Sequence, residues 1–181
     1  MRHVAVFAVF ALLGVTPLAR ADAQTARATV PDSVRAVYRD TLLVLRDSTA
    51  AVRGAASRFS RDLQFAGSRT VLNRARRLGT ACANLRAMLA DAQDMFQSSR
   101  APASAREEAR ALLRSIRELR TALYTNCVNG LAATGPGETA DSLRSWGPYH
   151  TSRLERHLLT YDDAASGMAQ AMDVKLEPRL P

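Results

Sequence analysis

The most regular pattern in the chain lies in residues 71–96, which read VLNRARRLGTACANLRAMLADAQDMF. Apolar side chains recur here at alternating spacings of four and three residues, at Val71, Ala75, Leu78, Cys82, Leu85, Leu89, Ala92 and Phe96. Because an α-helix turns once in about 3.6 residues, this spacing places them on one face. The pattern is typical of helices that pack about 20° from parallel or antiparallel. The stretch therefore predicts a long helix buried along one side against other helices.

Similar stripes lie before and after this stretch. The earlier one begins near Pro31, which suits a first helical turn, and ends at Gly67-Ser68. There the glycine suits the C-cap of one helix and the serine the N-cap of the next. The apolar positions of the earlier stripe are Val34, Tyr38, Leu42, Leu45, Val52, Ala56, Phe59 and Leu63. In the later one, Ser104 and Glu107 form a capping-box pattern that predicts a helix start. Its stripe is Ala109, Leu112, Ile116, Leu119, Leu123, Cys127 and Leu131.

The last part of the chain predicts a short helix followed by a long one. Leu143 and Trp146 fit the short helix, which Gly147-Pro148 would end. The final helix would start at Pro148, with an inner face of His150, Leu154, Leu158, Tyr161, Ala165, Met168 and Met172. We therefore expect an all-α, elongated, antiparallel up-down-up-down four-helix bundle with long helices of about 40–50 Å. Three long helices plus a short one is the alternative.

The N-terminus has the three parts of a secretory signal peptide. Met1-Arg2-His3 is a positive start, residues 4–18 are apolar, and residues 19–23 offer two small-x-small cleavage patterns. The apolar run is shorter than the ~20 residues needed to span a bilayer, and it contains Pro17. We expect cleavage near Ala21 or Ala23 and an exported chain, periplasmic or secreted, with no integral membrane span.

These features divide the chain into four expected parts. They are a signal peptide at residues 1–23, a disordered segment at 24–30, a helical bundle domain at 31–176 and a C-terminal tail at 177–181.

Cys82 and Cys127 lie on two apolar stripes of a chain expected to leave the reducing cytosol. Oxidising compartments favour the pairing of two such cysteines, with buried free thiols as the alternative. Helix geometry allows the bond if the third helix extends about 12 Å beyond the end of the second. The role of this pair would be a staple, because Cys127 does not belong to the C-x-x-C-H pattern of covalent haem attachment.

Basic residues exceed acidic ones, with 25 Lys+Arg against 17 Asp+Glu and a formal charge of +8. Two groups of arginine stand out: Arg74, Arg76 and Arg77 in one predicted helix, and Arg106, Arg110, Arg114 and Arg117 on one face of the next. Such faces attract anionic lipid, polysaccharide or nucleic acid. No aromatic residue suited to stacking on bases lies near either group in the sequence.

Two alternatives compete with polyanion binding by these arginines. The arginine excess is equally explained by a compositional bias. A solvated face paired with carboxylates is a second explanation, with Asp91 and Asp94 near Arg106 and Arg110 across the helix hairpin, and Glu118 near Arg114.

The sequence carries no motif of a known enzyme class. His150 and His157 are seven residues apart, about 10.5 Å along a helix, which is too far for both to ligate one metal ion. Nucleophile-elbow, P-loop and Rossmann glycine patterns are absent, and no cofactor is predicted. We expect a non-enzymatic protein that binds a protein or envelope partner. Electrostatic polyanion binding and a metal- or cofactor-binding bundle are the alternatives.

Overall fold

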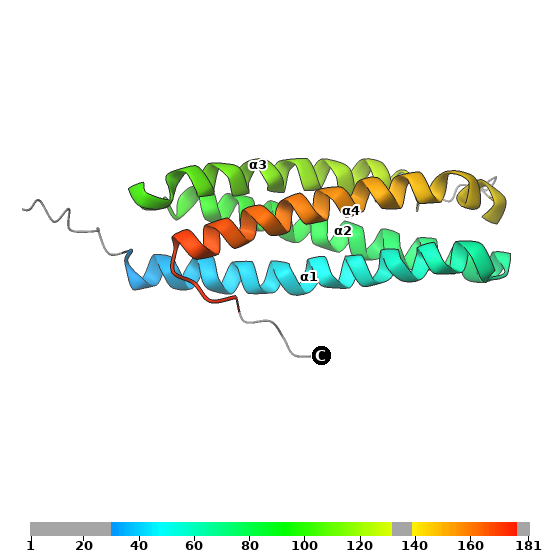
Figure 1. Cartoon of the computed structure of the whole chain (residues 1–181), viewed down its shortest axis with the longest axis horizontal. Coiled ribbons are helices and arrows are strands. Elements are labelled where there is room, and N and C mark those ends of the chain that lie inside the picture. Colours follow the sequence, from blue (N-terminus) through cyan, green and yellow to red (C-terminus); the bar gives the residue numbers. More distant parts are fainter. Residues whose placement is uncertain (1–29, 132–138, 177–181) are drawn as a thin grey trace, which may run out of the picture.

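The computed structural model describes residues 30–131 and 139–176, and over these residues it is helical with no strand (Figure 1). The elements in order are α1 (Asp32–Phe65), α2 (Ser68–Ser98), the 3-10 turn η1 (Ala103–Ala105), α3 (Arg106–Ala122), the π-helical turn η2 (Leu123–Val128) and α4 (Ala140–Ala171). The all-α prediction is confirmed. The expected signal peptide, residues 24–29 of the next segment and the tail lie outside the described residues.

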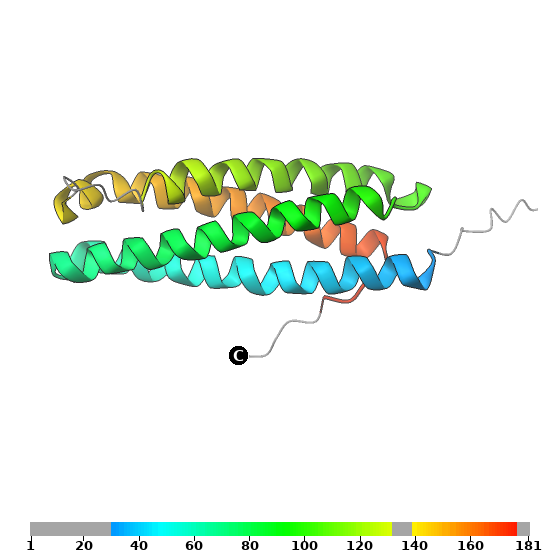
Figure 2. The same cartoon turned by 180° about the vertical axis from the view of Figure 1, so that it is seen from behind.

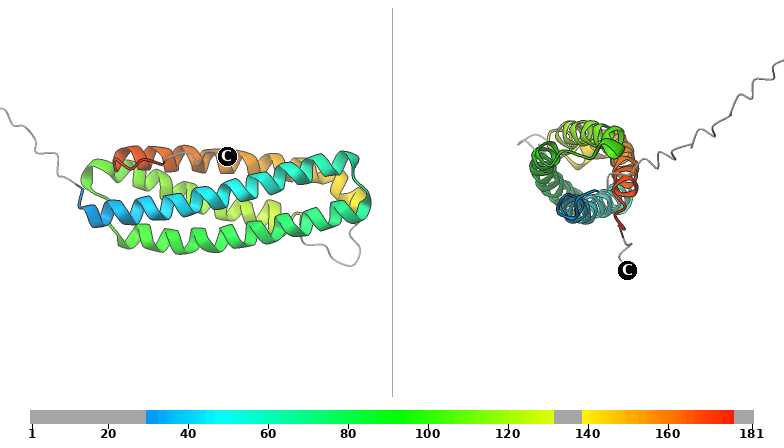
Figure 3. Two further views of the ribbon diagram at one scale, coloured as in Figure 1. Left: turned by 90° about the horizontal axis from the view of Figure 1, so that it is seen from below. Right: turned by 90° about the vertical axis from the view of Figure 1, so that its left-hand side faces the viewer.

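Four long helical segments pack lengthwise around one core, as the side views show (Figures 1 and 2). Helix α1 packs against α2 and α4, while α3 packs against α4 and α2. Seen end-on, the segments surround the core, and the molecule is much longer than it is wide (Figure 3). All four segments therefore share one apolar core.

The predicted stripes form this core. All the stripe residues of 71–96 are buried, as are those of α1 except the half-buried Val34. In the third stripe only Ala109 is half-buried, and on α4 the exceptions are Trp146 and His150. The Tyr38 and Phe96 rings stack with centroids 4.8 Å apart. The heptad reading thus identified most of the core.

Residues 140–171 form one helix, so the prediction of two helices separated at Gly147-Pro148 was wrong. Pro148 has no N–H to donate to the preceding turn, which usually disfavours a helix interior. Tertiary contacts offset this loss. The Arg144 guanidinium donates to the carbonyl oxygens of Leu63 and Ala66 at 3.1 and 2.8 Å, and Gly147 is buried against α1.

The predicted capping box at Ser104 was also wrong. Ala105 N–H donates to the Pro102 carbonyl at 3.0 Å, which closes the turn η1 and places Ser104 inside it. Helix α3 then starts at Arg106, and no side chain caps it. Burial of Ala105 in the core, rather than side-chain capping, fixes this end of the helix.

The third helix widens into a π-helical turn at its C-terminal end. Leu119, Leu123, Cys127 and Leu131 follow one another at steps of four residues, and all are fully buried. In an α-helix each such step overshoots a turn by about 40°, so three steps would rotate Leu131 about 120° away from Leu119. The hydrogen bond from Asn129 N–H to the Tyr124 carbonyl, 2.8 Å across five residues, marks the wider turn that removes this drift.

Candidate functional site

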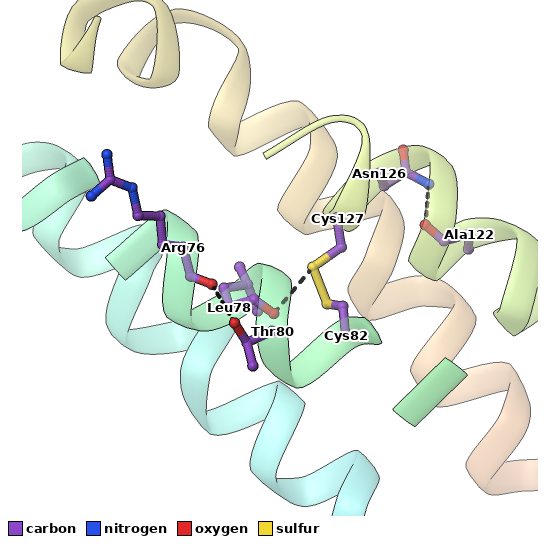
Figure 4. The surroundings of a disulfide bond; sticks show 7 residues. All are labelled: Arg76, Leu78, Thr80, Cys82, Ala122, Asn126 and Cys127. Carbon is purple, nitrogen blue, oxygen red and sulfur yellow. Dashed lines mark hydrogen bonds between the residues drawn. A yellow bond between two sulfur atoms is a disulfide. The ribbon is translucent and has the colours of Figure 1, made fainter. Parts of the chain in front are cut away.

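The two cysteines form a disulfide between α2 and η2 (Figure 4). Their sulfur atoms lie 2.00 Å apart and their Cα atoms 6.3 Å apart, and both side chains are fully buried. The bond fixes the π-helical turn on α2. Because it lies within the core, it fits the predicted role of a staple.

The three arginines predicted to form a cluster on α2 differ in their surroundings. The Arg74 Nε lies 2.7 Å from Asp62 Oδ2 of α1, so a salt bridge between helices neutralises this charge. Arg76 and Arg77 are exposed, and Figure 4 shows the Arg76 guanidinium pointing away from the disulfide. The structure therefore leaves two of the three predicted arginines on the surface of α2.

The predicted basic face of α3 is exposed along its length, at Arg106, Arg110, Arg114 and Arg117. Within residues 30–131 and 139–176, none of these arginines forms a salt bridge. The arginines that do are Arg35, Arg39, Arg46, Arg53, Arg74 and Arg144.

The expected pairing of Asp91 and Asp94 with Arg106 and Arg110 is not formed among these residues. An exposed pair such as Arg114–Glu118 contributes little in water, and it is not formed either. The charge of this face is therefore open to an external partner.

Two clefts flank this face and share Arg117 and Thr121. The first, of about 600 Å³, lies between the α3–η2 segment and α4, and we call it the histidine cleft. Its charged and ring-bearing residues are Arg117, Glu118, Tyr149, His150, Arg153 and His157. The second, of about 380 Å³, lies between α2 and the α3–η2 segment, where it is lined by Arg86, Arg117, Arg120, Thr121 and Tyr124. The two clefts form one continuous surface across three helices.

Two tyrosines lie beside arginines on this surface. The Arg86 guanidinium is 5.1 Å from the centroid of the Tyr124 ring, and that of Arg153 is 5.4 Å from the Tyr149 ring. Arg153 also donates a hydrogen bond to the Tyr149 hydroxyl. Both rings are exposed, at 43% and 55%. We call Arg86, Arg117, Arg120, Tyr124, Tyr149 and Arg153 the arginine–tyrosine surface.

Sequence reasoning missed the tyrosines of this surface. It found no aromatic residue near the basic groups, whereas the fold places Tyr124 and Tyr149 in the clefts beside Arg117. The i, i+4 spacing of Tyr149 and Arg153 was a usable signal. The pairing of Arg86 with Tyr124 across two helices left no signal in the sequence.

His150 is held in the histidine cleft by a buried amide. Asn126 is 8% exposed, and its Nδ2 donates to the Ala122 carbonyl at 3.2 Å, which leaves its Oδ1 as the acceptor for His150 Nδ1 at 3.1 Å. Partial burial, and then the positive charge of Arg153, lower the pKa of His150. Near pH 7 the His150 ring is therefore mostly neutral, and the contact with Asn126 Oδ1 places its proton on Nδ1, which leaves Nε2 as the free ring nitrogen.

The two histidines line one cleft but do not form part of a metal-ligand cluster. His150 and His157 both border the histidine cleft. Among the residues that the structure describes, no group of three or more His, Cys, Asp and Glu side chains could hold a metal ion.

A third cleft, of about 450 Å³, lies between α1 and α2 and is mostly apolar. Val44 and Met95 line it and are 54% and 41% exposed. The Thr41 hydroxyl lies 3.0 Å from the Met95 sulfur. Met168 and Met172, which the sequence places on the inner face of the last helix, are buried core residues.

None of the described helices combines the length and the apolar character that crossing a bilayer requires. No protein-family model, curated protein or solved structure matches the chain.

Proposed function

We propose that this protein is an exported, non-enzymatic helical bundle that binds an acidic polysaccharide of the cell envelope through the basic face of α3. The observation that carries the proposal is a difference in salt-bridge formation between the arginines of this face and arginines elsewhere. Those on α3 have no carboxylate partner in the described residues, whereas six arginines elsewhere form salt bridges. Unneutralised guanidinium groups favour an anionic ligand.

The spacing of the charges fits a linear polymer. Arg106, Arg110, Arg114 and Arg117 follow the axis of α3 over about 16 Å, at 1.5 Å per residue. A polymer with repeated charges can contact several of them at once, which raises its overall affinity above that of a single contact. The exposed rings of Tyr124 and Tyr149 add apolar faces on which sugar rings can pack.

The exported location and the chain direction of the bundle belong to the same proposal. The buried disulfide supports an oxidising compartment, in agreement with the signal peptide expected at residues 1–23. A connection of two residues, Ala66-Gly67, joins α1 to α2. So short a connection between packed helices favours antiparallel neighbours, and we extend this to an up-down-up-down bundle.

The test is retention on an acidic polysaccharide, such as immobilised heparin, as a function of salt. Each neutralised charge releases counterions, so we expect the affinity to fall steeply as salt rises. The triple variant R110A/R114A/R117A should elute at clearly lower salt than the wild type. The matched control R35A/R39A/R53A removes the same charge from arginines that already form salt bridges, and it should elute close to the wild type.

Equal losses in the two triple variants would show that only net charge matters, and they would refute the proposal. Anionic vesicles and a single-stranded oligonucleotide are the competing ligands. Tighter binding of either than of the polysaccharide would assign the face to that class instead.

A second candidate function is binding of a protein partner at the α1–α2 cleft. The exposed Val44 and Met95 support it, because methionine-lined clefts adapt to apolar side chains of a partner. A pull-down from an envelope extract with wild-type protein and the variant V44S/M95S tests it. A partner retained equally by both proteins would exclude this cleft.

A further inference from the structure

We propose that the histidine cleft binds one tetrahedral oxyanion, the sulfate or phosphate ester of a larger ligand, and binds it more tightly as the pH falls. The inference rests on the proposed function, since Arg117 belongs both to the basic face of α3 and to this cleft. It adds a specific subsite to a surface that otherwise acts through charge alone.

Two guanidinium groups approach the cleft from different helices. Arg117 projects from α3 and Arg153 from α4, and both are exposed and form no salt bridge among the described residues. Arg117 Nε donates to the Leu113 carbonyl at 3.2 Å and Arg153 donates to the Tyr149 hydroxyl, so the remaining N–H groups of each guanidinium are the donors for an anion. Guanidinium groups bind tetrahedral and planar oxyanions through paired N–H donors. Glu118 is the one carboxylate among the residues that line this cleft, so the lining is positive.

The π-helical turn supplies the third element of the subsite. It places Asn126 so that the amide oxygen accepts the Nδ1 proton of His150. When His150 gains a second proton, this proton resides on Nε2, and the ring then donates to Asn126 and to an anion at the same time. The hydroxyl groups of Thr121 and Thr125 already donate to carbonyl oxygens of their own helix, so they add little to binding.

The pH dependence follows from the groups that face His150. The charged and titratable side chains of the cleft are Arg117 and Glu118 from α3, with Tyr149, Arg153 and His157 from α4. Of these residue types, only histidine ordinarily changes its charge between about pH 5.5 and 8. The lowered pKa leaves the His150 ring mostly neutral near pH 7 in the free protein. A bound dianion favours the charged ring, so binding takes up a proton and the affinity rises as the pH falls from 8 toward 5.5.

Sulfate is the probe, because it remains a dianion over this pH range. Calorimetric titration of the full chain should give an affinity at least about fivefold higher at pH 5.5 than at pH 8. Substitution of one arginine that donates to a charged ligand typically weakens binding about tenfold or more, so we expect this loss in R153A. R156A is the matched control, because Arg156 is exposed on α4 outside the cleft, and it should bind as the wild type does.

The variant H150Q should lose the increase in sulfate affinity between pH 8 and pH 5.5. Acid enhancement that survives H150Q, or equal losses in R153A and R156A, would overturn the inference. The same titration with inorganic phosphate, a sugar phosphate and the corresponding neutral sugar shows whether the site prefers a free anion or an ester. Tight binding of the neutral sugar would also contradict an oxyanion site.

The variant R106A/R110A separates this inference from the proposed function, since both residues lie outside the cleft. It should elute from the polysaccharide at lower salt than the wild type, while its sulfate affinity stays unchanged. If the wild-type protein is retained on the polysaccharide but shows no measurable sulfate binding, only the cleft site is rejected. Sulfate binding without retention would reject the proposed function alone.

Discussion

Breaking the Cys82–Cys127 disulfide is the perturbation whose effect on stability can be worked out most directly. The bond spans 45 residues and encloses the whole of α3. For a loop of this length, the chain-entropy model gives a stabilisation of about 4 kcal/mol, which is an upper value. For a chain of this size, each kcal/mol shifts the midpoint of thermal unfolding by about 2–4 °C. We therefore expect a decrease of about 8–16 °C.

The assay is denaturant unfolding of the wild type with and without a reductant, followed by helical circular dichroism. Reduction should lower the free energy of unfolding and raise the denaturant dependence, because the open chain exposes more surface when unfolded. The double variant C82A/C127A is the control, and the reductant should not change its stability. The reduced wild type is the better reference, since alanine also leaves unfilled space at two fully buried positions.

A loss below about 1 kcal/mol on reduction would refute this reasoning. It would mean that the reduced, unfolded chain already keeps α2 and the α3–η2 segment together. The bond would then not stabilise the protein by removing the entropic cost of closing this loop.

Three further perturbations test the packing and the electrostatics. Gly147→Ala should destabilise the bundle by about 1–3 kcal/mol, because the added Cβ would lie 3.0 Å from the Leu63 Cδ1 and the α1 packing must shift. Gly167→Ala, in the same helix with nothing within 4 Å of the added Cβ, should instead stabilise it by up to about 1 kcal/mol, and thermal unfolding compares the two. The lowered pKa of His150 means that the unfolded chain binds this proton more tightly, so stability should fall as the pH drops below about 6.5. In H150Q this contribution should disappear from a pH series of denaturant midpoints.

The buried face of α2 could be predicted from the sequence, because its pattern contains nothing that competes with a helix. Each stripe residue from Val71 to Phe96 follows the heptad spacing, and each is buried. The cysteine pair was also predictable, since Cys82 and Cys127 lie on two such stripes. In both cases a periodic pattern fixed the side-chain direction before any tertiary contact had to be known.

The interruption predicted at Pro148 failed for a different reason. Local preference disfavours proline inside a helix, yet contacts with α1 decide the outcome at this position. The Arg144 guanidinium binds carbonyl oxygens at the end of α1, and Gly147 leaves space for Phe59 and Leu63. These partners lie about 80 residues away in sequence, and Arg144 and Leu63 are separated by 81 positions. A local sequence pattern therefore cannot predict the contacts.

Of the arginine–tyrosine surface, only Arg117 was predicted from the sequence, as part of the basic face of α3. That face follows from the spacing of its arginines, and they are exposed as expected. The tyrosines come from η2 and α4, and their proximity depends on the register between helices, which the disulfide and the core packing set. A sequence taken one helix at a time cannot supply that register.

The π-helical turn links the core to the proposed subsite. Cys127 and Asn126 are adjacent, and the wide turn directs the first to the α2 disulfide and the second to His150. In a regular α-helix, the four-residue steps from Leu119 would have turned Leu131 away from the core, as the drift of about 40° per step requires. Burial of these apolar side chains therefore stabilises the π-helical turn, and the turn in turn determines where the amide of Asn126 lies. The spacing of apolar residues in the core thus sets the position of Asn126, the one buried amide in the cleft. Such a link agrees with the frequent occurrence of π-helical turns at functional sites.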